Sequence, residues 1–350
     1  MNRPSPNKRH SSAGRRPRIV RAGLQCAGPL ACLLFTLVSG ASLGCAARSD
    51  PIVFTSDRDG DLEIYKVDLD DLEQQDLTNS PADEFSPRLS PDGRMVAFLS
   101  GSENDMSLEV MLADGTERAR MGPITGRYSS HRWSPDNRRI AYVAKKQSDS
   151  FLYVGNADGS QTVLLTPILV DEVGDWSPGA DSVVFSVTTE GEQGVWVRNP
   201  DGVNEFRLTE HPDFGPVWSP DSKRIAFLSR RDGNAELYIM MADGTAQKRL
   251  TNSDAPEYHV SWSPNGKRLM FVSERDGNPE IYVTDIKGDK QKRLTTNNVR
   301  DDEPVWAPNG RKIAFVSYLD GDADIFVMDA DGGNQIRVTN NDFADTSPSW

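Results

Sequence analysis

No cysteine occurs after Cys45 in this chain of 350 residues. All three cysteines, Cys26, Cys32 and Cys45, lie within the first 45 residues, so the remainder can form no internal disulfide bond. The folded part of the chain must therefore be stabilised by packing.

No acidic residue occurs before Asp50, whereas seven Lys and Arg residues lie in the first 21 positions. An apolar stretch over residues 28–38 follows, and then small residues over 39–44. This order is typical of a secretory signal, and the stretch is too short for an ordinary membrane-spanning helix. We predict a signal peptide at 1–45, a short linker at 46–51 and one folded domain at 52–350.

Cys45 lies where a lipoprotein signal places its acylated cysteine, within Ser42-Leu43-Gly44-Cys45-Ala46. That pattern expects Leu three residues before the cysteine, and here Leu43 comes one residue late. The alternative is ordinary cleavage near Gly40 or Ala47. The pair Arg15-Arg16 suggests a twin-arginine signal as a further alternative, although the flanking residues Gly14 and Pro17 match the pattern of such signals poorly. The sequence thus predicts either a periplasmic protein or a lipoprotein anchored to the outer membrane at Cys45.

Removal of the leader would leave 32 basic against 52 acidic residues, a net charge of −20. So acidic a surface argues against nucleic acid and anionic lipid headgroups as direct partners. A membrane contact is expected only through a lipid on Cys45. The charge favours a partner that is basic where it makes contact, or it serves solubility alone.

The folded part is built from one repeated segment, whose clearest copy begins at Trp218-Ser219-Pro220-Asp221 and ends at Arg249-Leu250-Thr251. Successive copies are 42–44 residues apart. The repeat is marked by a large apolar residue, which we call the landmark: Leu89, Trp133, Trp176, Trp218, Trp262, Trp306 and Trp350. Four short β-rich runs in each such period are typical of a propeller blade.

The runs are separated by recognisable turns. Ser-Pro-Asp-Gly at 90–93 suits a tight turn after the landmark strand, because Pro presets φ and Gly closes the turn. Arg-Asp-Gly, at 58–60, 231–233 and 275–277, precedes a third strand. Asp-Gly pairs such as 243–244 then lead into a short outer strand.

Counting the strands predicts an all-β fold with seven blades. The apolar second strand occurs seven times, first at 52–55, where no landmark strand precedes it. The landmark strand also occurs seven times, and nothing follows the last at Trp350. We therefore expect the terminal strands to pair within one four-stranded blade and close the ring. The alternative is six blades with a half blade at each end.

The strings of the type Trp-Ser-Pro-Asp-Gly-Lys-Arg-Ile-Ala-Phe, with Arg-Asp-Gly and Arg-Leu-Thr, resemble the WD-like repeats of the TolB family over residues 52–350. TolB is a periplasmic component of the Tol–Pal envelope system, with an α/β domain before a six-bladed propeller that binds a lipoprotein. The six residues 46–51 leave no room for that first domain after Cys45. Similar repeats precede the hydrolase domain of prolyl-oligopeptidase-like peptidases, but no Gly-x-Ser-x-Gly motif occurs within residues 52–350, so we expect no peptidase.

Five residues before the landmarks, six of the seven positions are carboxylates, and Tyr128 holds the seventh. The carboxylates are Glu84, Asp171, Asp213, Glu257, Asp301 and Asp345. Equivalent positions of a propeller converge on one mouth of its channel, so these residues are candidates for binding a basic peptide, an amine or a cation. The alternative is structural: each carboxylate accepts backbone hydrogen bonds and ties its loop to the adjacent blade.

His131, His211 and His259 all precede landmark residues and are candidate metal ligands at the mouth. Such a site would resemble that of the oligogalacturonate lyases, propellers whose histidines hold a divalent metal. Their offsets from the landmarks differ, so ordinary loop histidines are the competing interpretation. The segment 57–61 resembles a calcium loop but lacks the Gly and Glu that an EF-hand places at its sixth and twelfth positions, so we interpret it as a hairpin turn.

No nucleophile or cofactor motif appears, and we predict no cofactor. The leading prediction is a noncatalytic scaffold in the bacterial cell envelope that binds an envelope protein or peptide through the loops at the channel mouth. The alternative is a carbohydrate-binding or lyase-like enzyme with a histidine metal site at the same mouth.

Overall fold

The computed structural model describes residues 51–350 except 103–104, 122–127 and 147–148. The predicted signal peptide at 1–45, Cys45 and all but Pro51 of the linker lie outside the described residues. The described part is all β, and none of it forms a helix long and apolar enough to cross a membrane.

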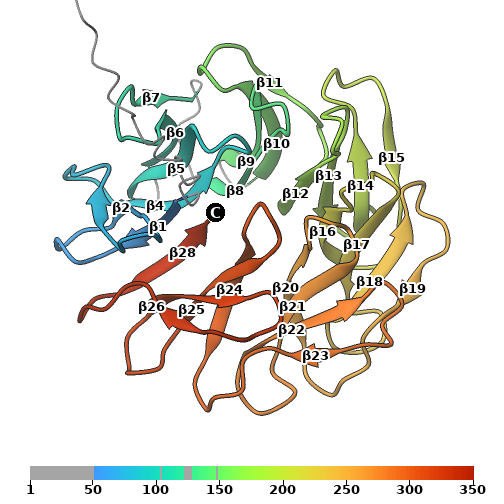
Figure 1. Ribbon diagram of the computed structural model, residues 1–350. Helices are drawn as coiled ribbons and strands as arrows, with labels where there is room; N and C mark the ends of the chain where they lie inside the picture. Colours follow the sequence, from blue (N-terminus) through green and yellow to red (C-terminus); the bar gives the residue numbers. More distant parts are fainter. Residues whose placement is uncertain (1–50, 103–104, 122–127, 147–148) are drawn as a thin grey trace, which may run out of the picture. The chain divides into compact units, whose positions relative to one another are not determined.

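Twenty-eight strands form seven four-stranded antiparallel sheets, which are the blades of a propeller (Figure 1). Blade 1 has the strand order β28-β1-β2-β3, and blades 2 to 7 follow in sequence order from β4 to β27. The first strands of the blades, which line the channel, are β28 Asp345–Ser349, β4 Glu84–Leu89, β8 Tyr128–Trp133, β12 Glu172–Trp176, β16 Asp213–Trp218, β20 Glu257–Trp262 and β24 Asp301–Trp306. The second strands are β1 Ile52–Ser56, β5 Met95–Ser102, β9 Arg139–Lys146, β13 Val183–Val187, β17 Arg224–Ser229, β21 Arg268–Ser273 and β25 Lys312–Ser317.

The two remaining strands of each blade lie farther from the channel. The third strands are β2 Glu63–Val67, β6 Asp105–Leu112, β10 Asp149–Asn156, β14 Gly194–Arg198, β18 Glu236–Met241, β22 Glu280–Asp285 and β26 Asp324–Asp329. The outer strands are short: β3 Gln74–Asp76, β7 Ala119–Arg120, β11 Thr162–Leu164, β15 Glu205–Arg207, β19 Lys248–Arg249, β23 Lys292–Arg293 and β27 Ile336–Arg337.

The two ends of the described chain complete blade 1, as predicted. Strand β28 pairs antiparallel with β1, and Val53 lies opposite Ser349 (Figure 1). The ion pair between Arg58 and Asp345, at 2.9 Å, joins the same two ends. The alternative of six blades with two half blades is therefore wrong.

The hydrophobic core is divided among the seven interfaces between neighbouring blades. In β17, Ile225 and Phe227 belong to the cluster shared with blade 4, whereas Ala226 and Leu228 belong to the cluster shared with blade 6. Seven such clusters run around the ring, and each joins two adjacent blades. The second strands are apolar at successive residues because both of their faces are covered.

The landmark tryptophans tie neighbouring blades together. The indole N–H groups of Trp133 and Trp176 donate to the backbone carbonyls of Arg88 and Arg132, at 2.9 and 3.0 Å. Trp262 donates in the same way to Val217, at 3.2 Å. Each of these carbonyls belongs to the residue just before the landmark of the preceding blade. Five landmarks, Trp133, Trp176, Trp218, Trp262 and Trp306, are buried, whereas Leu89 and Trp350 are partly buried against the core.

Every first strand carries a bulge or register irregularity in its pairing with the second strand. In five blades the residue at the irregularity has a positive φ between 50° and 56°: Ser86, Gly215, His259, Glu303 and Ser347. Bulges re-aim side chains and increase the local twist. Here they lie along the channel, so they determine which side chains point into it.

Candidate functional site

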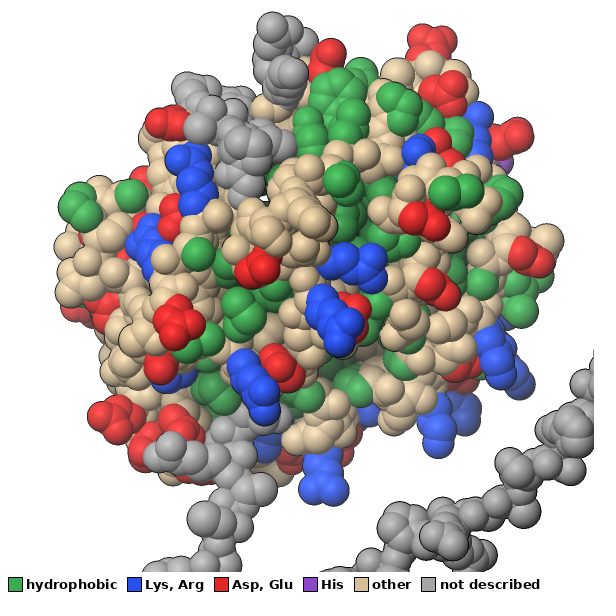
Figure 2. Space-filling model, turned by 90° about the horizontal axis from the view of Figure 1, so that it is seen from above, with side chains coloured by type: hydrophobic (Ala, Val, Ile, Leu, Met, Phe, Trp, Pro, Cys, Tyr) green, Lys and Arg blue, Asp and Glu red, His purple; other side chains and the backbone are tan. Residues whose placement is uncertain are grey.

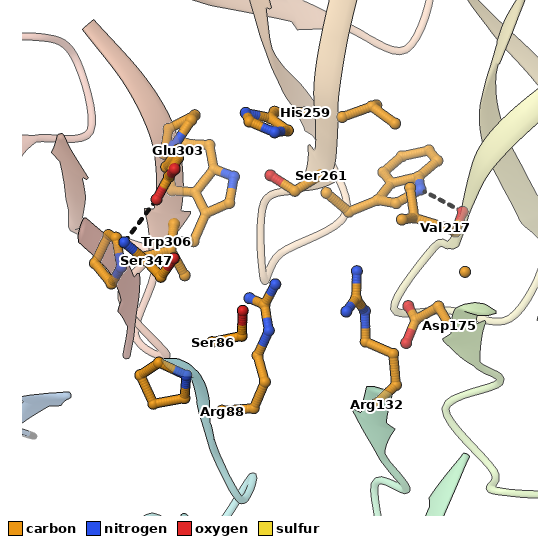
Figure 3. A pocket seen from close by; sticks show the side chains of 17 residues that line it. Ser86, Arg88, Arg132, Asp175, Val217, His259, Ser261, Glu303, Trp306 and Ser347 are labelled. Carbon is orange, nitrogen blue, oxygen red and sulfur yellow. Dashed lines mark hydrogen bonds between the residues drawn. The ribbon is translucent and has the colours of Figure 1, made fainter. Parts of the chain in front are cut away.

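The central channel contains a cavity of about 520 Å³, lined by residues of the first strands (Figure 3). A second cavity of about 560 Å³ is lined by residues of the Ser-Pro turns, among them Pro91, Pro264 and Pro308. Volumes of this size are typical of small-molecule sites. We call the end of the channel at which the first strands begin the mouth.

Two arginines from adjacent blades project into the central cavity (Figure 3). Arg88 lies near the end of β4 and Arg132 near the end of β8, each one residue before its landmark. Both residues line the first and the second cavity. Burial lowers the pKa of Arg88 to about 9, and the nearby charge of Arg132 adds to this effect.

Two carboxylates belong to the wall of the same cavity. Asp175 holds in blade 4 the position that the two arginines hold in blades 2 and 3, and burial raises its pKa to about 6. Glu303, in blade 7, accepts a hydrogen bond of 2.6 Å from the backbone N–H of Ser347 (Figure 3). The cavity therefore holds charges of both signs on different blades.

Aromatic and charged side chains form a group at the mouth, in blades 5 to 7. We call the following residues the mouth cluster: Phe214, Arg230, Tyr258, His259, Glu274, Arg300, Asp302 and Tyr318. Its members are linked by a cation–π contact of Arg230 with Phe214 at 4.9 Å, the pair of His259 Nδ1 with Asp302 at 2.7 Å, and the ion pair of Arg300 with Asp302 at 2.6 Å. A recess of about 280 Å³ that includes Phe214, Tyr258 and Arg132 adjoins the cluster.

Five of the six predicted carboxylates are buried, and each of these five is the first residue of the first strand of its blade. Four of them form ion pairs with arginines: Glu84 with Arg118, Asp213 with Arg231, Glu257 with Arg275 and Asp345 with Arg58, at 2.5–2.9 Å. These carboxylates therefore do not present an exposed acidic surface, and their geometry matches the structural alternative. Their ion pairs lie within one blade, whereas Ser80, Ser253 and Asn341, in the segments that lead in from the preceding blade, donate hydrogen bonds to Glu84, Glu257 and Asp345.

The Arg-Asp-Gly motif explains three of these ion pairs. In blade 5, Arg231 bonds Asp213, stacks on Tyr238 at 4.8 Å and donates to Gln247. The Asp of the motif, Asp232, accepts a hydrogen bond from the hydroxyl of Tyr238. Blades 1 and 6 repeat this arrangement with Arg58 and Arg275. The motif therefore fixes the loop between the second and third strands, and the segment 57–61 is such a turn.

Asp301 and Asp171 depart from the common arrangement. Asp301 is buried and accepts a hydrogen bond from Asn297 at 2.6 Å, but no described Lys or Arg forms an ion pair with it. Burial raises the pKa of Asp301 to about 6. Asp171 is exposed just before β12 and accepts a hydrogen bond from the backbone N–H of Thr188. Of the predicted carboxylates, Asp171 is thus the exposed one.

The three candidate histidines occupy different environments. His131 is buried in β8, and burial lowers its pKa to about 3, so its ring is neutral. His211 is exposed in the loop before β16, whereas His259 lies at the mouth against Asp302. Across the described ranges, the one group with the spacing of metal ligands contains no histidine, so the structure does not assemble the predicted histidine site.

That group consists of Asp320, Asp322 and Asp324. The guanidinium of Arg337 bonds both Asp320 and Asp324. A protein cation therefore already neutralises these two carboxylates.

Sequence reasoning did not single out Arg88 and Arg132. The signal available was position, because the residue before the landmark lines the central cavity in blades 2 to 7. The type of that residue is not conserved around the ring, being Arg in two blades and Asp, Val or Ser in the others, so the repeat itself does not mark it.

Comparison with known proteins identifies the family. The TolB beta propeller domain family matches residues 48–214 and 210–306. A TolB homologue of Chlorobium luteolum is 28% identical over 201 residues, which cover 57% of this chain and 35% of that protein. The Tol-Pal system protein TolB of Thioalkalivibrio sulfidiphilus is 35% identical over 72 residues, 19% of this chain and 17% of that protein.

The chain thus spans about a third or less of the length of these curated relatives. Among solved structures, an oligogalacturonate lyase in complex with manganese has a TM-score of 0.66 at 16% identity, covering 79% of this chain and 85% of that one. At that identity the likeness concerns the fold alone. The repeats, the seven blades and the family match lead to one conclusion: the chain belongs to the TolB beta propeller domain family.

Proposed function

We propose that this protein is an exported, noncatalytic binding protein of the bacterial cell envelope, and that it binds a protein partner through the mouth cluster. The observation that carries the proposal is the composition of that cluster. Aromatic residues and Arg are the types that dominate the binding energy of protein interfaces. Here Phe214, Tyr258 and Tyr318 are half-buried, and Arg230 and Arg300 are exposed beside them.

The contacts within the mouth cluster support this role. Cation–π and ion-pair contacts hold the side chains of the cluster in place before a partner arrives. A surface held in its binding geometry loses less side-chain freedom on association. The resemblance to TolB, a component of an envelope system, supports a partner in the same compartment.

A basic contact on the partner remains a prediction. The excess of acidic residues over the folded part favours it at long range. The face drawn in Figure 2, however, shows Lys and Arg side chains interspersed with Asp and Glu, and the mouth cluster carries both signs. We therefore propose contact through aromatic and guanidinium groups, with the overall charge affecting the rate of encounter.

Site-specific photo-crosslinking in cells of the source bacterium tests the proposal. A photo-reactive phenylalanine would replace Arg230 or Glu274 at the mouth, and Lys267, at the opposite end of blade 6, would be replaced as the control. All three positions are exposed. We expect one discrete adduct with an envelope protein from the mouth positions and none from Lys267. Equal adducts from all three positions, or none from the mouth, would contradict the proposal.

A further inference from the structure

Arg88 and Arg132 stand side by side in the channel, where two cavities meet. Both guanidinium groups point into the central cavity (Figure 3). Both residues also line the cavity of about 560 Å³ beside the Ser-Pro turns. A ligand in either cavity can therefore reach both arginines.

Neither arginine forms an ion pair within the part of the chain that the structure describes. No described carboxylate lies within ion-pair distance, 4.0 Å, of either guanidinium. Arg132 donates one bond of 2.9 Å to the carbonyl of His131, and Arg88 donates no side-chain hydrogen bond to any described residue. Two like charges that are partly removed from water repel each other and have lost hydration.

The nearest carboxylates of the cavity wall interact with the two arginines only at distances beyond an ion pair. Asp175 accepts a hydrogen bond of 2.8 Å from the backbone N–H of Trp176. Glu303 accepts one from the backbone N–H of Ser347 in blade 1 (Figure 3). In the described residues, neither guanidinium group therefore has a carboxylate bonded to it, although Asp175 and Glu303 line the same cavity.

The fold does not require arginine at these positions. The equivalent residues of the other blades are Asp175, Val217, Ser261, Val305 and Ser349. Trp133 and Trp176 use only the backbone carbonyls of Arg88 and Arg132, so the side chains take no part in that contact between blades. The arginine side chains therefore need an explanation other than packing.

We propose that Arg88 and Arg132 bind the oxyanion group, carboxylate or phosphate, of a small ligand in the central channel. Guanidinium groups present planar forks that bind both oxyanions through paired hydrogen bonds. The cavities on either side are large enough for the remainder of a ligand the size of a sugar. His259 of the mouth cluster also lines the central cavity, and Arg132 lines the recess beside the cluster, but this proposal does not depend on a protein partner binding at the mouth.

Calorimetric titration of the whole protein at low ionic strength tests the proposal, with glucuronate, glucose 6-phosphate and glucose as probes. The three share one sugar frame, so the two anions separate a carboxylate from a phosphate source, and glucose reports binding without an oxyanion. We expect at least one anion to bind about tenfold or more tightly than glucose. Binding of one anion only identifies the oxyanion, whereas equal binding of all three probes, or none, would overturn the proposal.

Variants then locate the site. The double variant Arg88→Gln/Arg132→Gln should abolish anion binding, and Asp175→Asn should strengthen it by removing a nearby negative charge. Arg94→Gln, at a side chain that is 83% exposed, is the matched control and should leave binding unchanged. The ligand-free double variant should melt at the same temperature as the parent or higher, since it loses a repulsion. A double variant that keeps the parent's affinity, or that loses several degrees of stability, would show that the arginines are structural.

Discussion

Leu319 occupies, in blade 7, the position that arginine holds in three other blades. Arg275 shows what the position normally does: it bonds a first-strand carboxylate, a serine and a glutamine. The corresponding acceptors in blade 7 are present as Asp301, Ser317 and Gln335, whereas Leu319 is exposed. Blade 7 therefore has all three acceptors that an arginine would contact, but a leucine stands in the place of that arginine.

We expect Leu319→Arg to stabilise the protein. The new guanidinium would bond a buried carboxylate, and hydrogen bonds to charged groups contribute about 1.5–3 kcal/mol. Denaturant unfolding measures the gain in the free energy of unfolding. Introducing the same change into an Asp301→Asn background is the control, and an equal gain in both backgrounds would mean that Asp301 is not involved.

The gain should depend on pH in a definite direction. Burial raises the pKa of Asp301 to about 6, above the value of about 4 in an unfolded chain. The folded state thus binds the proton more tightly, and the stability from this group is present below about pH 4 and lost as the pH rises through about 6. A guanidinium beside Asp301 lowers that pKa, so Leu319→Arg should stabilise more at about pH 8 than at about pH 4. Melting curves at both values test this, and a gain independent of pH would disprove it.

The first strands store backbone strain at their bulges. Ser86 has a φ of 54°, a region that glycine adopts at little cost and other residues rarely occupy. Gly215 holds the equivalent position in blade 5 with a φ of 56°. The same bulge is therefore built once with glycine and four times with a residue that carries a side chain.

Exchanging these residues should move stability in opposite directions. Ser86→Gly should raise the free energy of unfolding by up to about 1 kcal/mol, and Gly215→Ala should lower it by about 1 kcal/mol. An added Cβ at Gly215 meets nothing closer than 3.7 Å, so the effect there is conformational rather than steric. Chemical denaturation of both variants measures the changes, and shifts of the same sign would show that φ does not govern them.

The repeated elements were predictable from the sequence, and the residues that vary among them were not. Turns such as Ser263-Pro264-Asn265-Gly266 and the apolar second strands recur because every blade needs them, so their period predicted the seven sheets. The burial of Asp213 was not predicted, because its partner Arg231 lies 18 residues away in another turn. Arg88 and Arg132 hold equivalent positions in only two blades, so the period of the repeat did not predict their role.

Ring closure makes the last strand essential to the whole molecule. Deleting residues 345–350 removes β28, which leaves β1 with an open edge and Arg58 without Asp345. A fully buried Trp contributes about 3–5 kcal/mol, but Trp350 is only half-buried, so most of the loss should come from the strand and the exposed interface. We expect the truncated protein to lose its cooperative melting transition.

A synthetic peptide of residues 341–350 provides the complementary test. It should restore the transition when it is added in excess, because it can replace β28 in blade 1. Deletion of Trp350 alone is the milder control and should lower the melting temperature without abolishing the transition. A truncated protein that melts like the parent would show that pairing of the terminal strands does not hold the ring together.

The pairing of β28 with β1 also sets an order of events during synthesis. Strand β1 leaves the ribosome first among the described strands and β28 last, yet the two are neighbours in the finished molecule. Until β28 emerges, blade 1 has an open edge of the kind that promotes association with other chains. A nascent chain therefore benefits from being kept unfolded until β28 has emerged, and an unfolded chain is also the form in which many exported proteins cross a membrane.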